Sequence, residues 1–159
     1  MHRRVLVPVD GSAPSNQALL EAIKLVKAAS GKLRLVHVVD EFVMGGVDNP
    51  GFYNPAMVDA LRAVGRKTLQ DAESFVRQYA LEPSSALLET FGHRVADLVV
   101  SEAQSWGADL IVMGTHGRRG VRRLVMGSDA ELVMRASPVP VLLVRGQPEG
   151  TRLERRLAS

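Results

Sequence analysis

The chain has 159 residues, of which 46% are hydrophobic and 23% charged, a composition typical of a soluble globular domain and not of a disordered chain. The net charge is only +3 and aromatic residues make up 4%, which argues against a nucleic-acid surface built on base stacking. Cysteine is absent, which excludes disulfides and thiolate metal sites, and the sequence shows neither a signal-peptide core nor a membrane-spanning apolar run, so we expect a cytoplasmic protein.

Short apolar segments alternate with amphipathic ones along the first part of the chain. Residues 4–9 predict a buried strand that must end near Pro8, because proline has no N–H to donate. The apolar spacing that follows predicts a helix over residues 15–30, with Ser12 and Ser15 as alternative N-caps and Gly31 as the residue that ends it. Residues 32–39 predict a second strand.

A loop rich in glycine, proline and asparagine is predicted over residues 40–54, and a long helix is expected to begin at Pro55. Further strands are predicted over residues 86–91, 110–113 and 139–145, with helices over 95–106 and 128–136 between them. The long helix carries an apolar stripe that we expect to face the core: Met57, Leu61, Val64, Thr68, Ala72, Phe75 and Tyr79.

This alternation of strands and helices, with unbroken apolar strands, predicts an α/β fold whose parallel sheet is covered on both faces. We expect a single domain over residues 1–146. The polar residues 147–159 are expected to form a mobile tail.

The most specific pattern of the chain lies in residues 107–137. Gly114 and Gly117 bracket a turn after the fourth strand, four arginines follow, and a helix is predicted to begin at Ser128, which with Glu131 forms a capping-box signature. The start of a helix offers backbone N–H groups and the positive end of the macrodipole, so this arrangement predicts a phosphate site. The alternative is a tight loop in which Ser128 only caps the helix and the arginines are only solvated.

The spacing of this segment resembles the G-2x-G-9x-G-[S/T] motif of the ATP-binding universal stress proteins. Gly114 and Gly117 are followed after nine residues by Gly127 and Ser128, and D-L-I-V-M-G precedes the motif. The resemblance covers about residues 3–145. It implies a single-domain, three-layer α/β/α, Rossmann-like fold whose open five-stranded parallel sheet has the strand order 3-2-1-4-5.

The resemblance also implies a set of residues that bind ATP. Pro8, Val9 and Asp10 match the end of the family's first strand, where the acidic residue reaches the adenosine, and Val38 would offer backbone hydrogen bonds to the adenine edge. The remaining residues would surround the ribose and phosphates: Met113, Gly114, His116, Gly117, Arg118, Gly127, Ser128, Asp129 and Ala130.

Two residues near this site have simpler interpretations. Asp10 could form only an Asx-turn with Ser12, a common use of an Asp-Gly pair. His37 lies within a strand pattern and is more often a packed core residue than a ligand, so we do not assign it to the site.

Asp129 departs from the family pattern, which has a small or apolar residue at this position. Its carboxylate favours the helix dipole but would repel a phosphate. The arginines at 118, 119, 122 and 123 would offset the repulsion, as would a magnesium ion that bridges Asp129 or Asp10 and the phosphates.

The expected function is a regulatory, stress-response module with at most slow ATP hydrolysis, because the chain has no Walker P-loop and no kinase signature. The alternative is a nucleotide-free interaction module of the same fold that uses the arginine-rich loop. An adenylating enzyme is disfavoured, because V-D-G-S stands where an S-G-G-x-D-S loop would be expected.

The resemblance finally implies a homodimer through the last strand. Val139, Val141 and Leu143 belong to an apolar strand that would otherwise leave an open sheet edge. The alternative is an edge that the C-terminal tail protects.

Overall fold

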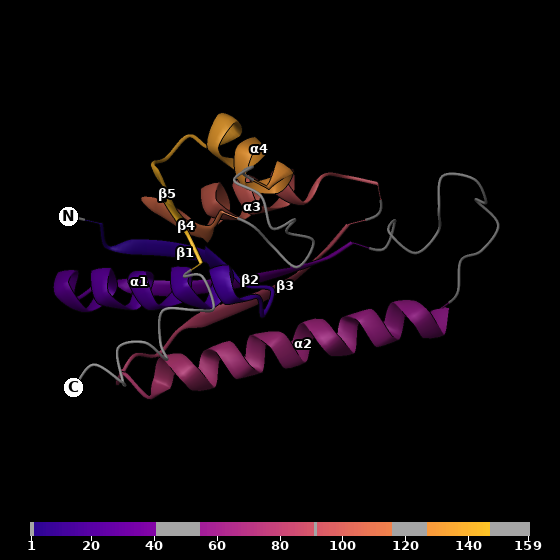
Figure 1. The fold of residues 1–159 in the computed structure, drawn as a ribbon, viewed down its shortest axis with the longest axis horizontal. Coiled ribbons are helices and arrows are strands. Elements are labelled where there is room, and N and C mark those ends of the chain that lie inside the picture. The colour runs from indigo at the N-terminus through magenta and orange to yellow at the C-terminus, as the bar shows by residue number, and fades with distance from the viewer. Residues whose placement is uncertain (1, 41–54, 91, 116–126, 147–159) are drawn as a thin grey trace, which may run out of the picture.

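The computed structural model describes residues 2–40, 55–90, 92–115 and 127–146 (Figure 1). The predicted tail, nearly all of the long loop and all four clustered arginines therefore lie outside the described residues. In the described part, strands and helices alternate as β1 (Arg4–Pro8), α1 (Ala13–Ala29), β2 (Lys32–Asp40), α2 (Pro55–Arg77), β3 (Ser84–Thr90), α3 (Val95–Trp106), β4 (Leu110–Gly114), α4 (Ser128–Ala136) and β5 (Val141–Val144).

The strands form one parallel sheet in the order β3-β2-β1-β4-β5, which confirms the predicted fold class. β1 lies at the centre, paired with β2 on one side (Pro8 opposite Val36) and with β4 on the other (Leu6 opposite Ile111). The chain order thus reverses between β1 and β4. Their carboxyl ends lie next to each other at one edge of the sheet.

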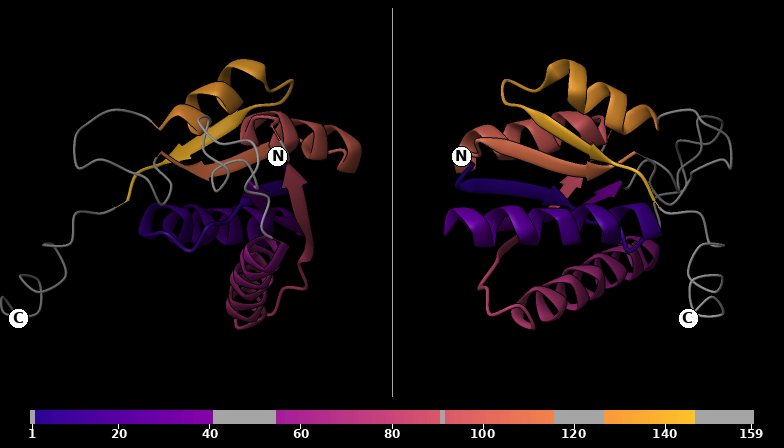
Figure 2. Two further views of the ribbon diagram at one scale, coloured as in Figure 1. Left: turned by 90° about the vertical axis from the view of Figure 1, so that its right-hand side faces the viewer. Right: turned by 60° about the vertical axis from the view of Figure 1, so that its left-hand side comes forward.

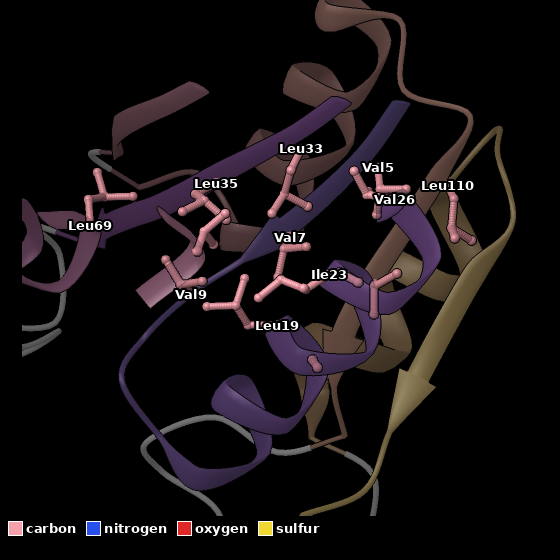
Figure 3. Close-up of a cluster of buried hydrophobic side chains, with 14 residues drawn as sticks. Val5, Val7, Val9, Leu19, Ile23, Val26, Leu33, Leu35, Leu69 and Leu110 are labelled. Carbon is pink, nitrogen blue, oxygen red and sulfur yellow. The ribbon is translucent and has the colours of Figure 1, made fainter. Parts of the chain in front are cut away.

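Helices α1 and α2 cover one face of the sheet, and α3 and α4 cover the other (Figures 1 and 2). Val5 and Val7 of β1 point into the core beneath α1 and α2, which Figure 3 shows, whereas Leu6 points into the core beneath α3 and α4. All three side chains have no exposed surface. Burial on both faces explains why the sequence of β1 is apolar throughout and not alternating.

The ends of α1 differ in part from the prediction. Ser12, not Ser15, is the N-cap, and its Oγ accepts a hydrogen bond of 3.3 Å from the Ser15 N–H. At the other end, Ser30 takes the left-handed conformation (φ 48°) that was expected of Gly31. Gly31 has a different reason to be glycine, because a Cβ there would lie 2.7 Å from the Arg3 carbonyl oxygen.

The predicted apolar stripe of α2 is only half right. Phe75 and Tyr79 pack against the core cluster that includes α1, but Met57 and Val64 are 43% and 44% exposed. The first half of α2 extends past the beginning of α1, so none of the described helices lies beside the stripe there (Figure 1). The residues of α2 that are buried lie on the adjacent side of the helix: Val58, Gly65, Leu69 and Val76.

No helix in the described ranges is both long enough and apolar enough to cross a membrane.

Candidate functional site

The candidate site lies at the carboxyl edge of the sheet, where β1 and β4 end side by side. After β1 the chain passes to α1 on one face, and after β4 it reaches α4 on the other (Figure 2). In open α/β sheets, ligands bind at such a reversal of strand order. The fold brings Asp10, Gly114 and the start of α4 to this edge from segments far apart in the sequence.

Backbone hydrogen bonds close the base of the segment that joins β4 to α4. The Gly127 N–H donates to the Thr115 carbonyl over 2.8 Å, and the Thr115 N–H donates to the Val144 carbonyl of β5 over 2.9 Å. The two ends of this segment are therefore fixed to the sheet. His116, Gly117 and Arg118 lie between them, outside the described residues.

Helix α4 begins without a side-chain cap, so the capping-box prediction was wrong. Gly127 is the N-cap (φ −60°, ψ 145°) and Ser128 is already the first helical residue. Glu131 makes the first helical bond, from its N–H to the Gly127 carbonyl over 3.1 Å, and its carboxylate pairs with Arg135. The N–H groups of residues 128–130 precede that first bond and point out of the helix end, where the macrodipole is positive.

The two described glycines of the motif have different environments. A Cβ on Gly114 would lie 2.8 Å from the Pro14 carbonyl carbon and 2.9 Å from the Pro14 Cβ, so the packing of α1 on β4 requires glycine there. The dihedral angles of Gly127 are open to any residue. Backbone conformation therefore does not require glycine at 127.

Asp10 makes the Asx-turn that was its simpler interpretation. Its Oδ1 accepts a 2.8 Å hydrogen bond from the Ser12 N–H, and its own N–H donates to the Ser15 Oγ over 3.2 Å. The turn fixes the orientation of the Asp10 carboxylate just after the end of β1.

The backbone N–H and C=O groups of Val38 point toward the β1 side of β2. Along a strand these groups point alternately to either side, and two hydrogen bonds show which residues of β2 face β1: the Lys32 N–H donates to the Arg3 carbonyl, and the Val9 N–H donates to the Val36 carbonyl. Residues 32, 34, 36 and 38 thus share one orientation. Val38 lies beyond the last β1–β2 pair, Pro8 opposite Val36, which places its N–H and C=O at the edge of the candidate site.

The other described residues of the predicted site fall into two groups, those with buried and those with exposed side chains. Val9, Met113 and Ala130 have buried side chains, so only their backbone groups are available to a ligand. Ser128 and Asp129 are exposed at the start of α4. Among the described residues no three histidine or acidic side chains lie together as metal ligands would.

The structure is that of an open parallel α/β sheet with a helix beginning at the reversal of strand order, where proteins of this class commonly bind phosphate-containing ligands. The model of the universal stress protein family matches residues 1–145, and the chain belongs to that family.

Relatives support this membership. The universal stress protein MJ0531 of Methanocaldococcus jannaschii is 29% identical over 145 residues, which cover 91% of this chain and 83% of that protein. A universal stress protein family member from Burkholderia pseudomallei has a similar solved structure, with 35% identity, a TM-score of 0.71 and coverage of 88% of this chain and 93% of that one.

Two more distant structures contain nucleotides. A universal stress protein in complex with cAMP has 22% identity and a TM-score of 0.68 and covers 92% of this chain and 99% of its own. The universal stress protein of Archaeoglobus fulgidus in complex with dAMP has 23% identity and a TM-score of 0.61, with coverage of 89% and 97%. At these identities the similarity to our chain is one of fold.

Proposed function

We propose that this universal stress protein is a regulatory module that binds ATP at the carboxyl edge of its sheet. The start of α4 carries the proposal: its N-cap is a glycine with no side-chain cap, and its first N–H groups point outward beside the end of β4. Such a helix end attracts a phosphate through both its N–H groups and its dipole. The cAMP and dAMP complexes of two family members support an adenine nucleotide as the ligand.

The parts of the nucleotide have separate partners in this proposal. The backbone of Val38 receives the adenine edge, Asp10 the ribose, and residues 127–130 the phosphates. Met113 and Gly114 line the end of β4 between them, with Pro8 and Val9 at the end of β1. His116, Gly117 and Arg118 complete the set on the strength of the sequence motif alone.

Magnesium enters this proposal with the nucleotide. The described residues provide no group of three side-chain ligands, whereas magnesium commonly binds one or two carboxylates together with phosphate oxygens. Asp129, exposed at the start of α4, is the carboxylate that we assign to it. Asp129→Asn should then weaken the magnesium dependence of ATP binding, and the same dependence in the variant and the wild type would exclude this role.

The proposal also includes a homodimer and a cytoplasmic location. The backbone of β5 faces β4 at residues 140 and 144, whose carbonyls accept from the Ile111 and Thr115 N–H groups. By alternation, Val139, Val141 and Leu143 turn their backbone groups outward, toward a second copy. The chain has no cysteine to oxidise, which suits the reducing cytoplasm.

The test is nucleotide content followed by calorimetry. Protein purified without added nucleotide is denatured, and its supernatant is analysed by anion exchange; emptied protein is then titrated with ATP, with and without magnesium. We expect co-purified adenine nucleotide, or a dissociation constant on the order of micromolar. No nucleotide in the supernatant and no heat at millimolar ATP would overturn the proposal and favour the nucleotide-free interaction module.

A further inference from the structure

Two of the buried polar side chains hold one peptide group at the candidate site. In the described part of the chain, the buried polar residues are Ser15, His37 and Thr90. The His37 Nδ1 lies 2.7 Å from the Val9 carbonyl oxygen, and the Asp10 N–H donates to the Ser15 Oγ over 3.2 Å. Both polar groups of the peptide between Val9 and Asp10 are thus bound by side chains from other elements, β2 and α1.

The imidazole of His37 is a donor in this contact. A carbonyl oxygen only accepts, so Nδ1 carries the hydrogen. The ring is held in place by α2, because a Cβ on Gly65 would lie 2.8 Å from the His37 Cδ2 and 2.7 Å from the Leu87 Cδ1. Glycine at 65 lets the helix pack directly over the ring.

Packing alone does not account for a histidine at this position. Leu33 and Leu35 precede it on the same face of β2, and both are buried in the core beneath α1 and α2. A third apolar residue would fill the space without placing a polar ring in the core. Burying a polar group is costly unless it is hydrogen-bonded, and here its partner is the Val9 carbonyl.

Ser15 closes a ring of hydrogen bonds around the same turn. Its N–H donates to the Ser12 Oγ, its own Oγ accepts from the Asp10 N–H, and the Ser12 N–H donates to the Asp10 carboxylate. The main chain and the side chain of Asp10 are therefore fixed together. Removal of either side-chain partner would leave a polar group of the Val9–Asp10 peptide without its bond.

We propose that His37 and Ser15 are positioning residues that lock the Val9–Asp10 peptide and so hold the Asp10 carboxylate ready for the nucleotide. This inference rests on the proposed function, and it gives His37 a role that its place in the core did not suggest. Neither side chain touches the nucleotide. Both act through Asp10, by fixing its geometry before the ligand arrives.

The test compares three variants by ATP calorimetry. His37→Leu fills the space without a donor, whereas His37→Asn keeps a donor, because its Nδ2 corresponds to the histidine Nδ1. Leu87→Ala is the matched control, since Leu87 packs beneath the same Gly65 but has no polar side-chain group that could bind the peptide. We expect His37→Leu to bind ATP about tenfold more weakly, a change equivalent to about 1.4 kcal/mol. His37→Asn and Leu87→Ala should stay near the wild-type affinity.

Wild-type affinity in His37→Leu would overturn the inference, and so would equal weakening in His37→Leu and His37→Asn. Ser15→Ala provides a second route to the same peptide and should weaken binding in the same direction as His37→Leu. Equal weakening by Leu87→Ala would show that the core, and not the peptide, controls affinity.

A measurement on the nucleotide-free protein tests this inference independently of the proposed function. NMR relaxation of the Asp10 and Ser12 amides should show more motion in His37→Leu than in the wild type and recovery in His37→Asn. If the wild type binds no ATP, the proposed function fails and the relaxation data still decide whether the lock exists. Unchanged Asp10 motion in His37→Leu would exclude the lock.

Discussion

Gly114 and Gly127 belong to the same sequence motif but have different places in the structure. Gly114 lies so close to Pro14, in the first turn of α1, that a Cβ would not fit between them. Gly127 is the N-cap of α4 and has dihedral angles that any residue can adopt. A loss of function on mutating Gly114 would therefore mix a packing defect with a ligand effect. The two positions call for different substitutions and have different expected outcomes.

Gly114→Ala should destabilise the fold. The new methyl group would lie within 3.0 Å of the Pro14 backbone, so α1 or β4 must shift, at a cost of about 1–3 kcal/mol. Urea unfolding measures this loss directly. A change below about 0.5 kcal/mol would show that the first turn of α1 moves aside easily.

Gly127→Ser should separate stability from binding. Serine is a good N-cap, and its hydroxyl would accept from the N–H of Ala130, so the free energy of unfolding should stay the same or rise by a few tenths of a kcal/mol. The same hydroxyl would compete with a phosphate, and we expect ATP affinity to fall about tenfold. Urea unfolding and calorimetry on one preparation test both parts, and unchanged affinity would remove Gly127 from the proposed site.

Single residues show where sequence reasoning succeeds and where it stops. Ser12 and Ser15 have the same side chain and lie in the same turn, so local chemistry could not decide which of them caps α1. Ser128 carried a capping-box signature, but the helix begins one residue too early for its hydroxyl to cap. His37 was correctly expected in the core, but its bond to Val9 depends on strand pairing, which no local pattern encodes.

At the scale of elements, Arg4 stabilises the end of α3. Its Nε donates to the Gly107 carbonyl over 2.9 Å, its Nη2 donates to the Trp106 carbonyl, and its guanidinium lies 4.4 Å from the centre of the Trp106 ring. These carbonyls belong to the last turn of a helix, where no helical partner remains for them. The contact lies at the start of β1, the end away from the candidate site.

Arg4→Met keeps the aliphatic part of the side chain and removes these interactions. We expect a loss of about 1–3 kcal/mol in urea unfolding, with ATP affinity unchanged. Arg3→Met is the matched control, because it removes the same charge from an exposed neighbouring side chain. Equal stability of the two variants would show that Arg4 contributes only its charge.

β5 is an edge strand on which the homodimer proposal can be tested. Leu142 is 39% exposed, and its backbone faces β4, so Leu142→Pro would damage the sheet itself and not the outer edge. Leu142→Lys leaves the backbone intact and places a charge on the edge. Sedimentation should then show a dimer for the wild type and a monomer for the variant.

Met57→Lys is the control for this experiment. Met57 is 43% exposed on α2, which covers the β2–β3 side of the sheet. The Met57→Lys variant should therefore remain a dimer in sedimentation. A monomeric wild type at micromolar concentration, or a dimer that persists in Leu142→Lys, would contradict pairing through β5.

The sequence predicted a helix well where the core covers the helix's apolar side along its whole length. Helices α3 and α4 match the expected residues, and Gly107 ends α3 with a φ of 70°. The prediction that the apolar stripe of α2 faces the core was wrong at Met57 and Val64, because an apolar pattern does not reveal where the adjacent helix begins. β5 begins at Val141, two residues after the predicted start, because Pro140 has no N–H to donate to the neighbouring strand.

For the whole molecule, composition and alternation were sufficient to predict a parallel α/β sheet, but the strand order came from the family resemblance. Pairing between β1 and β4, more than a hundred residues apart, leaves no local signal in either strand. That pairing creates the candidate site. The residues proposed for it lie at or just after the ends of β1, β2 and β4, so the site could be proposed from sequence only by analogy.

The most direct measurement is an NMR titration of isotopically labelled protein with ATP. We predict shifts of the amides of Asp10, Val38 and Ser128 at the carboxyl edge, and little change at Arg4 and Gly107 at the opposite edge. No shifts at millimolar ATP, or shifts concentrated around Arg4 and Gly107, would contradict ATP binding at the end of β1 and β4.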